Sequence, residues 1–260
     1  MKIELTKEQI DFLNRFTKEG TWKINTKTGL VDIKGKFDCS ESGLENFKGV
    51  RFGVVTGDFD CSFNQLKSLI GAPQKVGEDF KCYMNKLTSL EGAPQKVGRS
   101  FYCDRNKLTS LIGAPQEVKG YFDCSKNKLT SLEGAPQEVG EDFDCSCNKL
   151  TSFIGGPQEV KDRLFCHNNK LTSLEGAPKK CGYVDGFRGN LVDKEILNVI
   201  WERMQTTPNY HIALASLKTD FEKQRQKELD EINSRWEILS QIGDDDLAKG
   251  ASILGRIGAF

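Results

Sequence analysis

One phrase returns at a fixed interval through most of this chain. It reads NKLTSLEGAPQ where it begins at Asn85, and a looser copy begins at Asn64. Further copies, each 21 residues after the last, begin at Asn106, Asn127, Asn148 and Asn169. A fixed period of this size is the signature of a solenoid, in which stacked repeats share one core and no single repeat is stable alone.

The full repeat reads Phe-x-Cys-x-x-Asn-x-Leu-x-x-Leu-x-Gly-x-Pro-x-x-Val. Apolar and polar residues alternate in its first part, which predicts a strand of about three to five residues with one buried face. Gly and Pro disfavour a helix in its second part, so we expect extended or polyproline-like backbone there. The Val column is read as Val54, Val76, Val97, Val118, Val139 and Val160, continued by Cys181.

The cysteines follow the repeat and do not indicate disulfides or a metal. Seven of the nine occur once per repeat, at Cys39, Cys61, Cys82, Cys103, Cys124, Cys145 and Cys166. We interpret this column as small buried apolar side chains. The spacing Cys145-x-Cys147 does not match metal ligands, so we expect neither a metal nor another cofactor. The Asn of each repeat is predicted to satisfy buried backbone groups of the neighbouring turn.

Both ends of the array are predicted to be capped, which gives three parts: residues 1–36, 37–190 and 191–260. In the first part, Thr6 and Gln9 form a capping-box pattern for a short helix that Gly20 would end. One or two short strands should follow and close the open edge of the solenoid.

Residues 191–260 lose the repeat and are predicted to be helical, with a long polar helix over residues 208–242. Two interpretations stay open for this helix. It could bridge across solvent, or it could form a short coiled coil that makes a homo-oligomer, although its middle lacks a sustained apolar seam. The apolar, Gly-rich tail over residues 243–260 could be disordered, pack on the body or act as a docking peptide.

The repeat resembles the leucine-rich-repeat family, whose consensus is L-x-x-L-x-L-x-x-N-x-L. Phe80, Cys82, Asn85 and Leu87 occupy its last four fixed positions. The short period and the LTSL…P phrase are similar to the proline-containing subclass of bacterial secreted effectors. The Cys-rich GAPQ phrase and the segment GLVDIKGKFDCS are similar to arrays in tailed-bacteriophage genomes. The resemblance covers about residues 22–190 and implies a curved solenoid with short parallel strands on its concave face.

On that concave face, the polar positions of the strands would point outward. They carry nine acids against five bases, together with a cluster of aromatic residues and one Met. Tyr, Phe, Met and Arg are enriched at protein interfaces, although strands favour Tyr and Phe for structural reasons too. The candidate partner-binding residues are Asp60, Phe63, Lys81, Tyr83, Met84, Tyr102, Arg105, Tyr121, Asp123 and Asp144.

Composition argues against several other classes. The formal net charge is zero, whereas a general nucleic-acid binder needs a basic surplus. We find no apolar run long enough to span a membrane and no signal-peptide pattern, so we expect a cytoplasmic protein, in the host cytosol if phage-encoded.

Catalytic patterns are also missing, so we expect no enzyme. The only histidines, His167 and His211, lie in different regions, and no phosphate-binding Gly loop with a Lys occurs. The effector resemblance implies ubiquitin ligases with a catalytic Cys after the repeats, but residues 191–260 contain no cysteine.

Two hypotheses of function remain. The first is a non-enzymatic module that binds a protein partner through the concave face; if the chain is phage-encoded, the partner would be a host defence or regulatory factor. The alternative is a structural or assembly protein that oligomerises or docks through its C-terminal helix.

Overall fold

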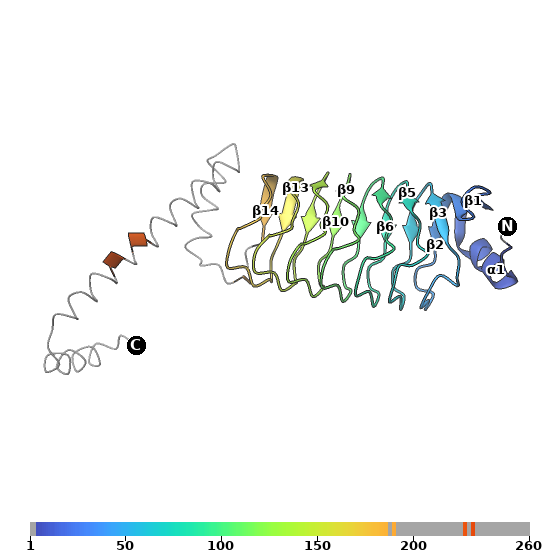
Figure 1. The fold of residues 1–260 in the computed structure, drawn as a ribbon, viewed down its shortest axis with the longest axis horizontal. Coiled ribbons are helices and arrows are strands. Elements are labelled where there is room, and N and C mark those ends of the chain that lie inside the picture. Colours follow the sequence, from blue (N-terminus) through green and yellow to red (C-terminus); the bar gives the residue numbers. More distant parts are fainter. Residues whose placement is uncertain (1–3, 187–188, 191–225, 228–229, 232–260) are drawn as a thin grey trace, which may run out of the picture. The chain divides into compact units, whose positions relative to one another are not determined.

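The computed structural model describes residues 4–186, 189–190, 226–227 and 230–231. The chain divides into two compact units, residues 1–198 and 199–260. The first unit contains a solenoid of stacked parallel strands (Figure 1). The helices expected over residues 191–260 lie outside the described residues, apart from residues 226–227 and 230–231, which are helical. The described helices include none that is long and apolar enough to cross a membrane.

The solenoid begins with a capped helix, as predicted. Helix α1 (Lys7–Phe16) has Thr6 at its N-cap: the Gln9 backbone N–H donates to Thr6 Oγ1 at 3.3 Å, and the Thr6 N–H donates to Gln9 Oε1 at 3.0 Å. Both donors would otherwise be unsatisfied at the helix start. The helix buries Phe12, Leu13 and Phe16 against the first turn of the solenoid.

The prediction that Gly20 ends this helix is wrong. The helix ends at Phe16, and β1 (Thr17–Ile24) follows directly, pairing antiparallel with β2 (Val31–Asp38). A Cβ at Gly20 would clash with the backbone carbonyl of Lys34. Gly is therefore needed for the close approach of the two strands, and the pair closes one end of the solenoid, as a capped sheet edge requires.

Each repeat contributes two short strands, so the solenoid has two stacks. The strands are β3 (Phe52–Val55), β4 (Phe59–Asp60), β5 (Lys75–Val76), β6 (Phe80–Lys81), β7 (Lys96–Val97), β8 (Phe101–Tyr102), β9 (Glu117–Val118), β10 (Phe122–Asp123), β11 (Glu138–Val139) and β12 (Phe143–Asp144). One stack runs β2-β3-β5-β7-β9-β11 and the other β2-β4-β6-β8-β10-β12. Both stacks join in β13 (Glu159–Phe165), which pairs with β14 (Lys180–Asp185). All pairings after β1 are parallel among the described strands.

This arrangement corrects three expectations. The Phe strands have two residues in most repeats, shorter than predicted, and the Val column forms a strand stack of its own. The Val column also begins one residue later than predicted: Val55 pairs with Val76 and is fully buried, whereas Val54 is 37% exposed. The first repeat is one residue longer than the others. The extra residue shifts the strand register by one, so Val55 faces the core and Val54 faces outward.

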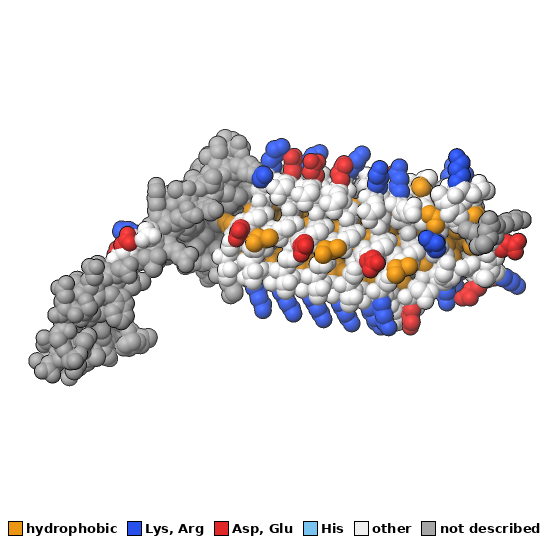
Figure 2. All heavy atoms as spheres, viewed as in Figure 1, with side chains coloured by type: hydrophobic (Ala, Val, Ile, Leu, Met, Phe, Trp, Pro, Cys, Tyr) orange, Lys and Arg blue, Asp and Glu red, His pale blue; other side chains and the backbone are white. Residues whose placement is uncertain are grey.

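The core is a set of parallel columns. Phe37, Phe59, Phe80, Phe101, Phe122 and Phe143 are fully buried. Neighbouring rings of this column stack with centroids 5.2–5.7 Å apart. Because each repeat follows its neighbour's register, the exposed side chains form rows as well, including a row in which hydrophobic and acidic side chains alternate (Figure 2).

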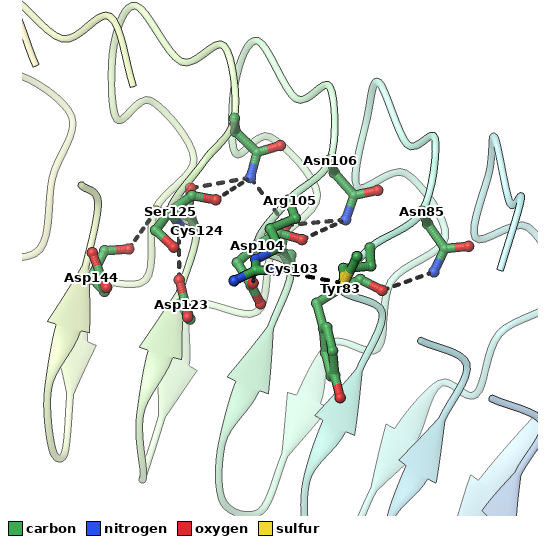
Figure 3. Close-up of polar contacts among 12 residues, drawn as sticks. Tyr83, Asn85, Cys103, Asp104, Arg105, Asn106, Asp123, Cys124, Ser125 and Asp144 are labelled. Carbon is green, nitrogen blue, oxygen red and sulfur yellow. Dashed lines mark hydrogen bonds and ion pairs between the residues drawn. The ribbon is translucent and has the colours of Figure 1, made fainter. Parts of the chain in front are cut away.

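The Asn column holds successive turns together, as predicted. Asn127 shows the pattern: its Nδ2 donates to the carbonyls of Cys103 (3.0 Å) and Cys124 (3.1 Å), and its Oδ1 accepts the Leu108 N–H at 3.0 Å. Figure 3 shows the Asn106 amide donating to the carbonyls of Cys103 and Asp104, and the Asn85 amide donating to the carbonyl of Tyr83. A buried amide thus satisfies backbone groups that the sharp turn leaves without partners.

Candidate functional site

The outward-pointing residues around each Phe-x-Cys strand form a surface that we call the strand face. It is formed by the exposed and partly exposed side chains among positions 58–63, 79–84, 100–105, 121–126 and 142–147. A groove of about 460 Å³ lies in it. Seven of the ten candidate residues line the groove, together with Asp104: Asp60, Phe63, Lys81, Tyr83, Met84, Tyr102 and Arg105.

Aromatic and sulfur-containing side chains form much of the groove. Phe63 and Tyr83 meet edge to face with ring centroids 5.2 Å apart, and Phe63 is 41% exposed. Met84 Sδ lies 3.8 Å from a guanidinium nitrogen of Arg105. These are large, partly exposed contact surfaces of the kind that anchors protein partners.

The residue directly before the Asn of each repeat has a left-handed backbone, in the groove and also at Lys126, Cys147 and Asn168 outside it. Phe63, Met84 and Arg105, each directly before the Asn of its repeat, have φ of 52–53°. This left-handed conformation suits Gly or Asn and costs a bulky residue about 1 kcal/mol or more. The Asn amide bonds fix the turn, so the strain persists and the side chains project outward from it.

Four of the repeats share a sequence on the strand face whose polar residues stabilise the repeat itself. In them the sequence is Phe-Asp-Cys-Ser, at residues 37–40, 59–62, 122–125 and 143–146. In each, the Ser N–H donates to the Asp Oδ1, at 2.8–3.1 Å. We call this contact the Asp–Ser turn. It explains most acids on the face without reference to a ligand, since Asp side chains commonly close such turns.

Two consecutive repeats whose side chains line the groove lack the Asp–Ser turn. Lys81 and Tyr83 replace Asp and Ser in one, and Tyr102 and Asp104 replace them in the next. These repeats lack a hydrogen bond that contributes about 1 kcal/mol of stability in each of the four repeats with the Asp–Ser turn. Their side chains therefore do not serve the scaffold in the way the Asp–Ser turn does.

The last described turn of the array also departs from the pattern, with Phe165 and His167 in place of Asp and Ser. Neither residue lines the groove.

The other three candidate residues lie beyond the groove, on the following turns. Tyr121 Oη donates to Asp144 Oδ2 at 3.3 Å, and Asp123 is the register neighbour of both Tyr102 and Asp144. Burial, with the nearby carboxylates of Asp104 and Asp144, raises the pKa of Asp123 to about 7. Figure 3 shows Asp104, Asp123 and Asp144 on three successive turns.

Sequence reasoning did not single out Asp104 as a site residue. It lines the groove, forms an ion pair with Arg105 (Nε to Oδ2, 3.7 Å), and has its carboxyl pKa raised mainly by burial. A comparison of the repeats with one another would have found it, because it is the only Asp that follows a column Cys.

The column cysteines are buried thiols, as predicted. Cys39, Cys61, Cys82, Cys103, Cys124, Cys145 and Cys166 are buried, while Cys147 and Cys181 are partly exposed, and all nine are free. Burial raises the pKa of the column thiols well above its usual value. Within the described part of the chain, no group of three His, Cys, Asp or Glu side chains is placed to hold a metal ion.

Comparison with known proteins does not add to this geometry. No model of a known protein family matches the sequence, and no curated protein does. The fold and the groove therefore carry the functional argument.

Proposed function

We propose that the chain is a non-enzymatic module that binds a protein partner at the groove of the strand face. The observation that carries the proposal is the loss of the Asp–Ser turn in two consecutive repeats. Because the two repeats stack on one another, the side chains that replace it lie next to one another and line a single groove.

The energetics point the same way. The two groove repeats lack a scaffold hydrogen bond that four other repeats make, and large, partly exposed side chains stand in its place. Partly exposed aromatic rings on a rigid surface lose little conformational freedom on binding, which favours affinity. A binding role accounts for the lost hydrogen bonds and for the aromatic side chains that replace the Asp–Ser turn.

The finer identity is part of the proposal. We place the chain among leucine-rich-repeat proteins of the short Cys- and Pro-containing type, on the basis of the Phe80–Leu87 pattern and the stacked Asn column. If the resemblance to phage arrays holds, the partner is a host defence or regulatory factor in the cytosol. The alternative assembly role depends on residues 208–242, which lie almost wholly outside the described residues.

The test uses a variant that restores the scaffold turn in the groove repeats. The changes are Lys81→Asn, Tyr83→Ser, Tyr102→Asn and Asp104→Ser, and we call the product the restored-turn variant. Asn closes this turn as Asp does, and it avoids a row of adjacent carboxylates. We expect the variant to fold at least as stably as the parent, so a loss of binding could not be attributed to unfolding.

A matched control makes the same kind of change outside the groove. Phe165→Asn with His167→Ser restores the turn in the last repeat. Affinity capture from the native host, analysed by mass spectrometry, should recover one partner with the parent and the control and lose it with the restored-turn variant. Equal recovery by all three proteins would refute the groove as the binding surface.

A further inference from the structure

The charges of the groove are not balanced once their contacts are taken into account. Both bases already have acidic neighbours: Lys81 Nζ lies 3.6 Å from Asp79, and Arg105 Nε lies 3.7 Å from Asp104. Asp60 accepts hydrogen bonds from the N–H and Oγ of Ser62 at 2.9 and 2.6 Å. Within the described residues, no base forms an ion pair with it, and Lys81, its neighbour in the strand register, is paired with Asp79.

The imbalance continues along the strand face. Asp123 and Asp144 are adjacent in register, and each is bonded by its own Ser N–H at 2.8 Å. Neither carboxylate forms an ion pair with a base in the described part of the chain. Burial, together with the nearby carboxylates of Asp104 and Asp144, raises the pKa of Asp123 to about 7, so this group carries only part of a negative charge at neutral pH.

Lys81 and the aromatic ring of Tyr102 separate Asp60 from Asp123 in the strand register. Tyr102 lies between Lys81 and Asp123 in the strand register, and its ring centroid is 5.6 Å from that of Tyr121. On the other side of the groove, Phe63 and Tyr83 lie edge to face. The faces of such rings attract cations, most strongly where water is partly excluded.

We infer that the groove recognises an arginine side chain of an extended, basic segment of the partner protein, with the guanidinium group against the Tyr83 and Tyr102 rings and within reach of the Asp60 carboxylate. This inference rests on the proposed function. It names the chemistry of the anchor that the groove selects.

Arginine fits better than the alternatives. Its planar guanidinium stacks on aromatic rings and donates two parallel hydrogen bonds to a carboxylate, whereas the ammonium group of lysine is a more strongly hydrated point charge. An acidic anchor would have to displace Asp79 or Asp104 from the two bases and would face the carboxylates of Asp60 and Asp123. A neutral anchor would leave Asp60 without an ion-pair partner.

The experiment selects ligands from random sequences, so the partner need not be identified first. Phage-displayed random dodecapeptides are selected on the full chain and depleted on the restored-turn variant. The enriched peptides are then synthesised, with each arginine changed in turn to lysine and to glutamine, and their affinities are measured by fluorescence anisotropy. We expect one arginine per peptide whose change to glutamine weakens binding about tenfold or more, with lysine intermediate.

Two point variants of the protein sharpen the test. Asp60→Asn should weaken the arginine peptides by about tenfold, as the loss of one charge-assisted contact would. Asp38→Asn is its matched control, because Asp38 makes the same contacts to its own Ser (3.1 and 2.7 Å) and does not line the groove. It should leave the affinity unchanged.

The experiment distinguishes failure of the arginine anchor from failure of the proposed binding function. If the enriched peptides lose binding to the restored-turn variant but tolerate the change of every arginine, the arginine anchor is refuted and the groove remains the binding surface. If no peptide is enriched, or if the enriched peptides bind the restored-turn variant equally well, the proposed function fails together with the inference.

Discussion

The Asn column gives a prediction whose size can be worked out from the contacts of a single residue. In Asn127→Ala, the carbonyl oxygens of Cys103 and Cys124 each lose one amide donor but keep another, from Asn106 and Asn148 respectively. The Leu108 N–H donates to Asn127 Oδ1 at 3.0 Å, and it would be left buried without that acceptor. The main cost is therefore one orphaned donor.

An unsatisfied buried N–H costs about 1–3 kcal/mol, and the space left by the amide adds to this. We expect Asn127→Ala to lower the free energy of unfolding by about 2–4 kcal/mol. Urea denaturation followed by far-UV circular dichroism measures this loss, from midpoints compared at constant slope.

The matched control is Gln137→Ala, in an exposed column of the same repeat array. An exposed substitution of this kind should change the free energy of unfolding by less than about 0.5 kcal/mol. If Asn127→Ala costs under about 1 kcal/mol, or no more than the control, the Asn amides do not hold the turns together as argued.

Two further predictions concern titratable groups. Burial, with Asp104 and Asp144, raises the pKa of Asp123 from 3.8 to about 7. Between these two pH values the folded protein keeps a proton on Asp123 that the unfolded chain has released. The stability contributed by Asp123 therefore falls as the pH rises from the lower value to the higher one. Asp123→Asn removes this loss, and calorimetry should show the Tm of the variant gaining on that of the parent from pH 5 to pH 8; a constant difference would contradict the assignment. In the native protein, a thiol reagent should modify Cys147 first and Cys181 more slowly, because burial raises the pKa of Cys181 to about 11 and the seven column thiols are buried. Rapid modification of more than two of the nine would show that the core opens readily.

The 21-residue period correctly predicted the buried Phe, Cys, Leu and Asn columns, because stacking gives equivalent residues the same neighbours in every turn. A residue such as Phe101 recurs every 21 residues with the same neighbours, so an apolar column must face inward in every turn. The role of the Asn followed from the same argument, since a polar residue fixed in every turn needs a fixed partner. The N-terminal capping box was readable because its contacts are local.

Contacts between distant residues were not readable in this way. Gly20 resembled a helix end, but its role comes from the backbone of Lys34 across the strand pair. The start of the Val column at Val55 depends on how the longer first repeat aligns with the second. Sequence distance alone does not specify either contact.

The residues of the groove were predicted from the sequence, but their different roles became clear only from the structure. The sequence singled out seven of its eight lining residues by type, but treated the strand face as one mildly acidic surface. The structure separated acids that close Asp–Ser turns from residues such as Tyr83 and Asp104 that replace them. That distinction needs hydrogen-bond geometry, which composition does not contain.

The sequence by itself determined a stacked repeat with buried Phe, Cys, Leu and Asn columns, because a strict period forces equivalent residues into equivalent environments. Only the tertiary structure decided that each turn carries two strands, that the residue before each Asn is left-handed, and that two neighbouring turns form one groove. The physical reason is that these features arise from backbone contacts between turns and from side chains 21 residues apart, and such contacts exist only after the repeats have stacked.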